Sequence, residues 1–527
     1  MQQLWLVSLL STLLSTMAIA QSIQGPHAAV NFQNVNVCPA RQTSPKPCSR
    51  TSKLTFNVTA TTTFGETKVV TQGTPNLDFT LGATTCKGTL ATGSSCTVTA
   101  KFAPRAAGVR MGAVQLTDSS GDLLASTYVH GNGQGPVAAF NPGARKNLPV
   151  GYAGGAMAVD AVGNVYFPAG GGFGKFDIAK FDVRTGVQTT VATGVPYAIG
   201  MAVDGAGNIF VSNGGVIKIA AGTGAQTKVG GVLNASAGVA VDGRGNLYVA
   251  DDWDIPIRGQ WGWPRLAEVF AATGGEATLL TGYAGDQGNP FLNYVWGVAV
   301  DGSGNAYIAC FNFGPVFESI AGTPPESGGG IFASRQFTTV GNFNNPSAVA
   351  VDAAGDVFVA DGGFDPNGIY EVAANSGNQT MVVNGPWEVQ IALDAAGDLF
   401  FQTDPTESTL AEVKGSQPAT LSFGKIAVGS TSAPQSVAIQ NVGNQPLNAV
   451  VPGLIVGTNF LQVPGSGTPP DCTSTFTLAP GASCNLSIVF APQSAGAING
   501  VATFIDNALN RTPSASQGVK LKGIGVQ

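Results

Sequence analysis

The sequence predicts an all-β protein in which a six-bladed β-propeller is flanked by two β-sandwich domains. Three observations predict this fold class: a motif repeated six times in the middle of the chain, a second repeat near its two ends, and a turn-rich composition. The chain has 527 residues, of which 72 are glycine, 44% are hydrophobic and only 11% are charged. This length indicates more than one domain, and this composition is typical of compact β structure.

The central repeat carries an Ala-Val-Asp or Ala-Leu-Asp motif, then a Gly-Asn or Gly-Asp pair, and then an apolar strand. Successive copies lie 38 to 59 residues apart, which matches a four-stranded propeller blade. The Asp can accept backbone N–H groups in the turn between two strands, so we expect it to be a turn cap rather than a catalytic carboxylate. The six aspartates are Asp160, Asp204, Asp242, Asp301, Asp352 and Asp394.

The predicted ring needs one strand from outside the six repeats. Third strands are predicted downstream of the motifs, and fourth strands follow in five repeats, but the sixth has none before about Pro418. An unassigned segment, Ala144 to Val150, precedes the first motif. We expect this segment to supply the missing strand and remove the exposed edges of an incomplete blade. The predicted propeller covers residues 137–414.

The two ends of the chain contain a second repeat. Segments 89–104 and 477–492 align without a gap, with Cys, Phe and Pro at matching positions. Each copy reads as a Gly turn, an alternating strand, an Ala-Pro stop and a further strand. They predict two copies of one β-sandwich module, over residues 21–136 and 418–527.

Both repeats resemble known families. The central motif is similar to the NHL repeat, which implies a propeller from Val137 to about Lys414. In the C-terminal module, Phe423-Gly424 and Asn441-Val-Gly443-Asn444 resemble ASH or choice-of-anchor D domains. That resemblance implies immunoglobulin-like sandwiches that act as spacers or adhesive domains, and it carries over no catalytic residue. Some NHL-like propellers are enzymes with histidines in the ring, whereas His27 and His130 both lie outside it.

Residues 1–20 predict a secretory signal peptide, because an apolar run ends in Ala18-Ile19-Ala20. No Lys or Arg precedes the run, which departs from the usual pattern. The alternative is an uncleaved anchor, but the run is short for a membrane span of roughly 20 residues. We expect no span in the mature chain and a secreted, periplasmic or cell-surface location.

The cysteines fall into three close pairs, Cys38 with Cys48, Cys86 with Cys96, and Cys472 with Cys484. This spacing predicts disulfides of an oxidising compartment and leaves Cys310 as a buried thiol, although the spacing alone does not establish the first bond. Zinc binding is the alternative, and two histidines with no Cys-x-x-Cys argue against it.

The composition also limits the partners. A net charge of −6 gives no basic surface for nucleic acid. Long connections are predicted on one rim of the ring, with tight Asp turns on the other, and loops on a rigid scaffold are common binding sites. One connection holds three of the six Trp, which suits a sugar ring or a protein hot spot, or else a small loop core. Trp296 and Trp387 are expected to pack inside. The candidate ligand-binding residues are Trp253, Trp261, Trp263, Asp251, Asp252, Arg265, Asp361 and Asp365.

The leading hypothesis is therefore a secreted, non-catalytic binding or scaffold protein that recognises a protein or glycan through its long-loop face, without cofactor or metal. One alternative is a Ca²⁺-dependent hydrolase or lactonase that would bind calcium in the channel of the propeller. Another is a purely structural cell-surface spacer. The fold alone does not decide among them.

Overall fold

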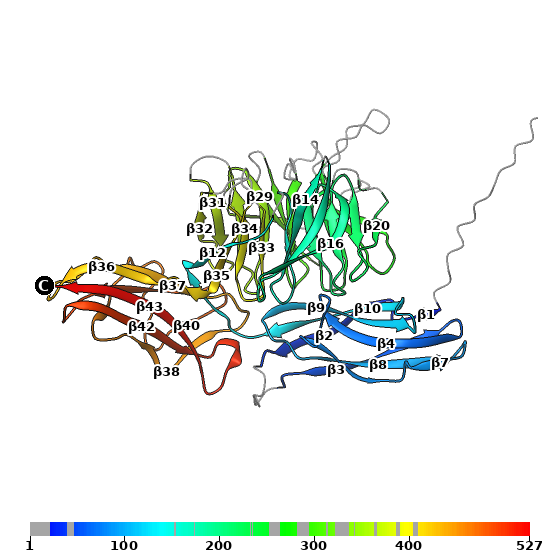
Figure 1. The fold of residues 1–527 in the computed structure, drawn as a ribbon, viewed down its shortest axis with the longest axis horizontal. Coiled ribbons are helices and arrows are strands. Elements are labelled where there is room, and N and C mark those ends of the chain that lie inside the picture. The colour runs from blue at the N-terminus through cyan, green and yellow to red at the C-terminus, as the bar shows by residue number, and fades with distance from the viewer. Residues whose placement is uncertain are drawn as a thin grey trace, which may run out of the picture.

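The computed structural model describes residues 22–38, 47–151, 154–172, 174–231, 233, 236–251, 264–281, 295–311, 315–321, 337–341, 343–362, 366–385, 390–403 and 409–527. This part of the chain is all-β apart from one short 3-10 helix, η1 (Ala508–Asn510). Figure 1 shows a ring of sheets resting on two elongated sandwiches. Among the described residues, no helix has the length and apolar character that a membrane span requires. The predicted signal peptide lies outside them.

The ring consists, within the described residues, of six four-stranded antiparallel sheets in chain order, which gives a propeller-like fold. They are β13 (Ala158–Val159), β14 (Val165–Gly172), β15 (Lys175–Asp182), β16 (Val187–Pro196); β17 (Gly200–Val203), β18 (Ile209–Ser212), β19 (Val216–Ile219), β20 (Gln226–Val229); β21 (Ser236–Val241), β22 (Leu247–Asp251), β23 (Arg265–Val269), β24 (Glu276–Thr281); β25 (Val295–Val300), β26 (Ala306–Cys310), β27 (Val316–Ser319), β28 (Phe337–Val340); β29 (Pro346–Val351), β30 (Val357–Asp361), β31 (Gly368–Val372), β32 (Gln379–Asn384); and β33 (Ile391–Leu393), β34 (Leu399–Gln402), β35 (Leu410–Pro418), β12 (Gly143–Leu148).

Strand β12 confirms the predicted ring closure. It pairs antiparallel with β35, with Leu148 opposite Leu410, and so completes the last sheet with residues from before the first. The innermost strands contact one another in a closed cycle, β13, β17, β21, β25, β29, β33 and back to β13. Glycine permits this close approach: a Cβ at Gly200 or Gly238 would lie 2.4 or 2.5 Å from backbone oxygen of the next strand.

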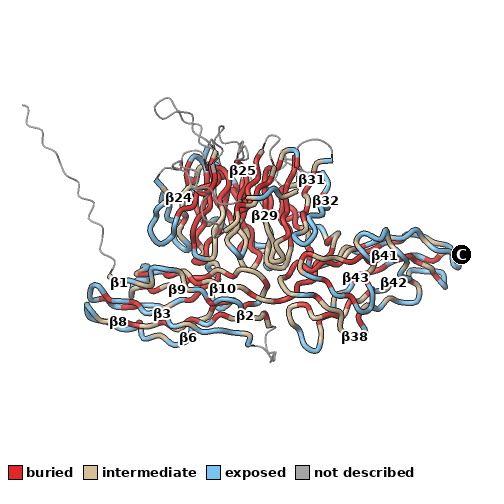
Figure 2. The backbone as a smooth tube through the Cα atoms, turned by 180° about the vertical axis from the view of Figure 1, so that it is seen from behind, coloured by how far each residue is buried: buried red, intermediate tan, exposed pale blue. Residues whose placement is uncertain are grey.

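Burial explains why the ring strands do not alternate between apolar and polar residues. All five residues of β22, β26 and β30 are buried, because neighbouring sheets cover both faces. Figure 2 shows buried backbone concentrated in the ring and exposed backbone along the outer sheets of the sandwiches. Cys310 is buried in β26, as the sequence predicts.

The N-terminal sandwich packs two sheets around one apolar core. In one sheet β1 pairs with β3, β3 with β8 and β8 with β6; in the other the order is β2-β10-β9-β4-β5, with β7 on β4. Phe79 stacks on Phe102 with ring centroids 4.7 Å apart, and Phe32 packs against both. The strands are β1 (Ile23–Gln24), β2 (Val30–Asn36), β3 (Arg50–Val58), β4 (Thr62–Thr71), β5 (Thr74–Pro75), β6 (Phe79–Thr84), β7 (Gly88–Leu90), β8 (Ser95–Phe102), β9 (Gly108–Asp118) and β10 (Leu123–Gln134).

The C-terminal sandwich has the same pairings, except that β5 has no counterpart among its described strands. Its sheets are β11-β37-β41-β39 and β36-β43-β42-β38-β40, and Phe460 stacks on Phe490 with centroids 5.0 Å apart while Phe423 packs against both. The strands are β11 (Ala138–Asn141), β36 (Leu421–Ala427), β37 (Gln435–Asn441), β38 (Leu447–Ile455), β39 (Phe460–Val463), β40 (Thr477–Leu478), β41 (Ser483–Phe490), β42 (Gly496–Asp506) and β43 (Ala515–Val526).

Strand β11 corrects one predicted boundary. The sequence assigns residues from Val137 onward to the propeller, but β11 pairs antiparallel with β37, with Phe140 opposite Ile439. Ala138 and Phe140 are buried in the core of the C-terminal sandwich, and this burial decides where the strand belongs. The ring is therefore inserted between the first strand of the second sandwich and the rest of it. Its two ends adjoin, since Gly143 pairs with Pro418.

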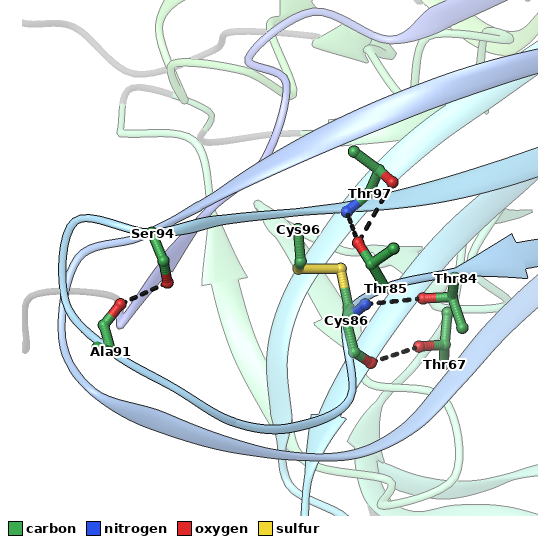
Figure 3. The surroundings of a disulfide bond; sticks show 8 residues. All are labelled: Thr67, Thr84, Thr85, Cys86, Ala91, Ser94, Cys96 and Thr97. Atoms are coloured by element: carbon green, nitrogen blue, oxygen red, sulfur yellow. Dashed lines mark hydrogen bonds between the residues drawn. A yellow bond between two sulfur atoms is a disulfide. The ribbon is translucent and has the colours of Figure 1, made fainter.

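The three predicted disulfides are all present, Cys38–Cys48, Cys86–Cys96 and Cys472–Cys484. Figure 3 shows Cys86–Cys96, where Thr97 N–H donates to Thr85 Oγ1 at 2.8 Å and Ser94 Oγ donates to the Ala91 carbonyl. In both sandwiches the bond ties the central strand β8 or β41 to the segment that follows β6 or β39.

Candidate ligand-binding face

The six repeated aspartates are turn caps, as the sequence predicts. In each turn one carboxylate oxygen accepts the backbone N–H groups two and four residues later. At Asp204, Oδ1 accepts from Ala206 at 2.9 Å and from Asn208 at 2.8 Å. The same pair of bonds occurs at Asp160, Asp242, Asp301, Asp352 and Asp394. These turns define one rim of the ring, which we call the turn rim.

The N-terminal sandwich docks on the turn rim (Figure 1). The Tyr128 hydroxyl on β10 donates to Asp204 Oδ2 at 2.6 Å, and Gln72 Nε2 donates to the Val203 carbonyl at 3.0 Å. Backbones also touch, because a Cβ at Gly205 would lie 2.5 Å from the Gly112 carbonyl oxygen. Burial and the neighbouring Asp204 carboxylate raise the pKa of Tyr128, so its hydroxyl stays a donor.

The C-terminal sandwich docks on the same rim. Gln440 Nε2 on β37 donates to Asp356 Oδ2 at 3.0 Å and also to Glu371. Asn375 Nδ2 donates to the Pro480 carbonyl at 3.3 Å. Val442 packs against Gly397 of the sixth sheet, where a Cβ would come within 3.1 Å of the valine. The turn rim is thus the docking surface for both sandwiches.

A cavity of about 460 Å³ lies between the centre of the turn rim and strand β9. Its lining includes Arg110, which is buried and bonded through Nε to Asp78 Oδ2 at 2.6 Å. Five of the capping aspartates line it as well, and in each of them Oδ1 accepts the N–H groups of its turn. Within the described residues, no group of three or more His, Cys, Asp or Glu side chains could hold a metal ion. The five are Asp160, Asp242, Asp301, Asp352 and Asp394.

The opposite rim, which we call the loop rim, carries three candidate residues that the structure describes. Asp251 and Arg265 face each other across β22 and β23, where Arg265 Nε and Nη2 both donate to Asp251 Oδ2, at 3.0 and 2.9 Å. Both side chains are buried. This ion pair joins the two strand ends from which the Trp-rich connection leaves.

Asp361, at the end of β30, is also buried and occupied. It accepts the backbone N–H of Asn345 at 2.6 Å and that of Asn344 at 3.1 Å, which ties β30 to the segment before β29. The other candidates, Asp252, Trp253, Trp261, Trp263 and Asp365, lie outside the described residues, as does Trp387. A ligand-binding role for the eight candidates stays a prediction.

Two features of the rims differ from what the sequence predicts. Trp296, expected in the core, is 36% exposed at a β-bulge of the innermost strand β25 and packs on Phe311 with centroids 5.0 Å apart. The equivalent positions in the adjacent sheets hold Ala237 and Ser347. A large residue where its neighbours have small ones was therefore the sequence signal that could have predicted this exposed position.

The second difference concerns a long connection. Strand β27 ends and β28 begins at the turn rim, so the connection 322–336 leaves from a rim where only tight turns were expected.

Fold and docking together define an all-β protein in which a propeller-like ring is held through one rim by two sandwiches. The C-terminal sandwich contains the match to a known family: ASH, described as Abnormal spindle-like microcephaly-assoc'd, ASPM-SPD-2-Hydin, matches residues 408–513. ASH domains are immunoglobulin-like, in agreement with the two-sheet fold seen here. The match begins just before β35 and does not include β11. No curated protein matches the chain.

Several solved structures of propeller type are similar to the chain. A gluconolactonase from Xanthomonas campestris is 12% identical, with 53% of this chain and 94% of that chain covered and a TM-score of 0.39. An auxiliary nutrient binding protein from Bacteroides thetaiotaomicron is 12% identical, with 68% and 93% covered and a TM-score of 0.36. The RRP9 WD40 repeats are 10% identical, with 52% and 98% covered and a TM-score of 0.34. At these TM-scores the likenesses carry no argument about function.

Proposed function

We propose that this protein is a secreted, non-catalytic binding or scaffold protein. Its ring is a six-bladed, NHL-like propeller that recognises a protein or glycan with the loop rim. Its two sandwiches are immunoglobulin-like modules, of the ASH or choice-of-anchor D type, that hold the propeller in a fixed orientation, as at a cell surface.

One observation carries this proposal: both sandwiches dock on the turn rim. Tyr128 and Gln440 place a side chain from each sandwich on the carboxylates of that rim. The loop rim is the face that points away from both sandwiches (Figure 1). Most of the long connections of the ring leave from this face, and binding residues concentrate in such loops on rigid scaffolds.

The Trp-rich connection between β22 and β23 is the part of this face that we propose to contact the ligand. Its two ends are fixed by the Asp251–Arg265 ion pair, which is shielded from water and so resists screening by salt. Asp251 and Arg265 then act as positioning residues, while Trp253, Trp261 and Trp263 supply the contact area. Aromatic side chains give large contact areas at low conformational entropy.

An oxidising compartment fits the three disulfides, two of which lie in the cores of the sandwiches. It also fits the predicted signal peptide over residues 1–20. We therefore place the proposed ligand outside the cytoplasm.

The proposal is tested with the variant Trp253→Ala/Trp261→Ala/Trp263→Ala of the full chain. A glycan array and a pull-down from extracellular extract identify a ligand of the wild type, and the triple variant should lose at least tenfold in affinity for it. Leu123→Ala is the matched control, because Leu123 is 59% exposed on the N-terminal sandwich. Unchanged binding by the triple variant would remove the site assignment.

The rival proposal, a Ca²⁺-dependent hydrolase, makes a different prediction. Metal analysis of the purified protein would then find one tightly held Ca²⁺ per chain, and removal of that ion would abolish hydrolysis of a lactone probe. A purely structural spacer would give no ligand in either binding assay.

A further inference from the structure

Four of the six turns satisfy their second carboxylate oxygen with an asparagine. The Asn lies four positions after the capping Asp, and its Nδ2 donates to Asp Oδ2 at 2.8 Å in the first repeat and 2.7 Å in the second. The third and fourth repeats have the same bond, at 3.3 and 2.9 Å. A tyrosine two positions further on adds a hydroxyl donor, as Tyr166 does for Asp160 at 3.2 Å.

The fifth repeat has lost both of these donors. Asp356 stands where the first four turns have Asn, and Phe358 stands where three of the repeats have Tyr. The sixth turn has the same two changes, at Asp398 and Phe400, but there Ser416 of the ring's own strand β35 donates its hydroxyl to Asp398 at 3.2 Å. The capping residue Asp352 therefore faces a second carboxyl group, and its buried Oδ2 atom has no hydrogen-bond partner among the described residues. Glu371 on β31 adds a third carboxyl group, and like Asp356 it is buried.

Among the described residues, Gln440 of the C-terminal sandwich is the side chain that donates hydrogen bonds to this cluster. Its single NH₂ group reaches Asp356 Oδ2 at 3.0 Å and also Glu371. The sandwich closes over the cluster through Gly481, where a Cβ would lie 2.5 Å from Asp356 Oδ1. No Lys, Arg or His in the described part of the chain forms an ion pair with any of these three acids. The two buried carboxyl groups of Asp356 and Glu371 and the buried Oδ2 atom of Asp352 thus share too few donors to be ionised together.

We propose that the contact between the fifth sheet and the C-terminal sandwich depends on bound protons, and we call it a proton-linked latch. Protons held by Asp352, Asp356 and Glu371 replace the missing hydrogen-bond donors. When these protons are present, the carboxyl groups donate hydrogen bonds to one another and accept from Gln440. When the protons leave, buried like charges repel one another and the sandwich loosens from the ring at this point.

The electrostatics of the cluster agree with this geometry. Burial raises the pKa of Glu371 to about 7 and that of Asp356 to about 6. Burial and the neighbouring charge of Asp356 both raise the pKa of Asp352. Ordinary carboxyl groups in the unfolded chain titrate near pH 4. The folded state therefore holds extra protons between about pH 4 and 7, and the stability that they contribute falls as pH rises through 6 to 7.

The test needs a local readout, because Asp394 in the sixth sheet and Asp506 in the sandwich also have raised pKa values. Hydrogen exchange of the full-length protein, corrected for intrinsic rates, supplies one. The peptides to follow contain Ala374, whose N–H donates to Asp356, and Gly481. We expect their protection factors to fall on the order of tenfold between pH 6 and 8, as one pKa unit corresponds to a factor of ten.

Asp356→Asn restores the asparagine of the first four repeats and should flatten this pH profile, and Glu371→Gln should reduce its slope. Glu318→Gln is the matched control, because Glu318 on β27 occupies the same repeat position in the fourth sheet. It should leave the fifth-sheet profile unchanged. Wild-type protection that does not change with pH, or a wild-type profile in Asp356→Asn, would overturn the latch. So would recovery of protection at pH 8 on addition of Ca²⁺, since a cation would then replace the protons.

Discussion

The two sandwiches share all strand pairings but that of β4 with β5, yet they recruit their first strand from different places in the chain. In the N-terminal sandwich β1 ends at Gln24 and β2 begins at Val30, so the first strand is local. In the C-terminal sandwich β11 ends at Asn141 and β36 begins at Leu421, and the whole ring lies between them. The comparison shows that the propeller-like ring is an insertion in the second of two tandem modules. Insertions are tolerated where the two ends adjoin, as they do here.

Phe140→Ala should have the largest effect on this comparison. Phe140 on β11 is 3% exposed in the core of the C-terminal sandwich, and such truncations cost about 3–5 kcal/mol. Hydrogen exchange should show lost protection in β36 to β43, with β13 to β32 unchanged. Ile23→Ala on β1 is the matched variant and should affect the N-terminal sandwich alone. Loss of protection in the ring after Phe140→Ala would contradict the insertion.

Tyr128→Phe should have an intermediate effect and tests how the N-terminal sandwich is held. The change removes a donor at 2.6 Å from the buried Asp204 carboxylate, which costs about 1–3 kcal/mol. Chemical denaturation should show the loss, and exchange in β9 and β10 should rise. Tyr370→Phe is the control, because its hydroxyl bonds an exposed carbonyl. An effect no larger than that of the control would exclude Tyr128 as a docking residue.

Asp506→Asn should have the smallest effect and separates the two sandwiches by pH. Asp506 is buried at the end of β42, and burial raises its pKa to about 6. Its stabilising contribution is complete below about pH 4 and is lost as pH rises through 6, so Asp506→Asn should flatten this decline. Asp118 is the equivalent residue at the end of β9 and is only half-buried. Thermal unfolding between pH 4 and 8 measures both, and an equal change in Asp118→Asn would refute the distinction.

Much of the fold could be predicted from the sequence because the repeats are local. The Val-Asp-x-x-Gly turns, the ring-closing segment that became β12, and the matched cysteines all carry their signal within a few residues. The four-residue strand β11 does not, since its partner β37 lies about 300 residues later and burial of Phe140 decides its place. Tertiary context overrides local pattern at such strands.

The candidate site could be predicted only in part. The antiparallel register that sets Asp251 opposite Arg265 is a property of the folded sheet, so their ion pair was not foreseen. The docking surface did leave a signal in the sequence. Phe210 and Asp356 depart from the repeat at turns that the sandwiches contact, where Tyr128 donates to Asp204 and Gln440 donates to Asp356. At these two turns, a departure from the repeat marks a place where another domain supplies a hydrogen bond.

The insertion also determines how the molecule would respond to mechanical tension between its ends. Pulling on the N-terminal sandwich loads the pairing of Ala138 to Asn141 with β37, together with the direct hydrogen bonds between the sandwiches, such as that from Asn510 Nδ2 to the Val37 carbonyl. The backbone of the ring is stretched between its two ends only after β11 is pulled away from β37. While that pairing holds, the two adjoining ends of the ring stay together, and tension between the sandwiches does not unravel its sheets.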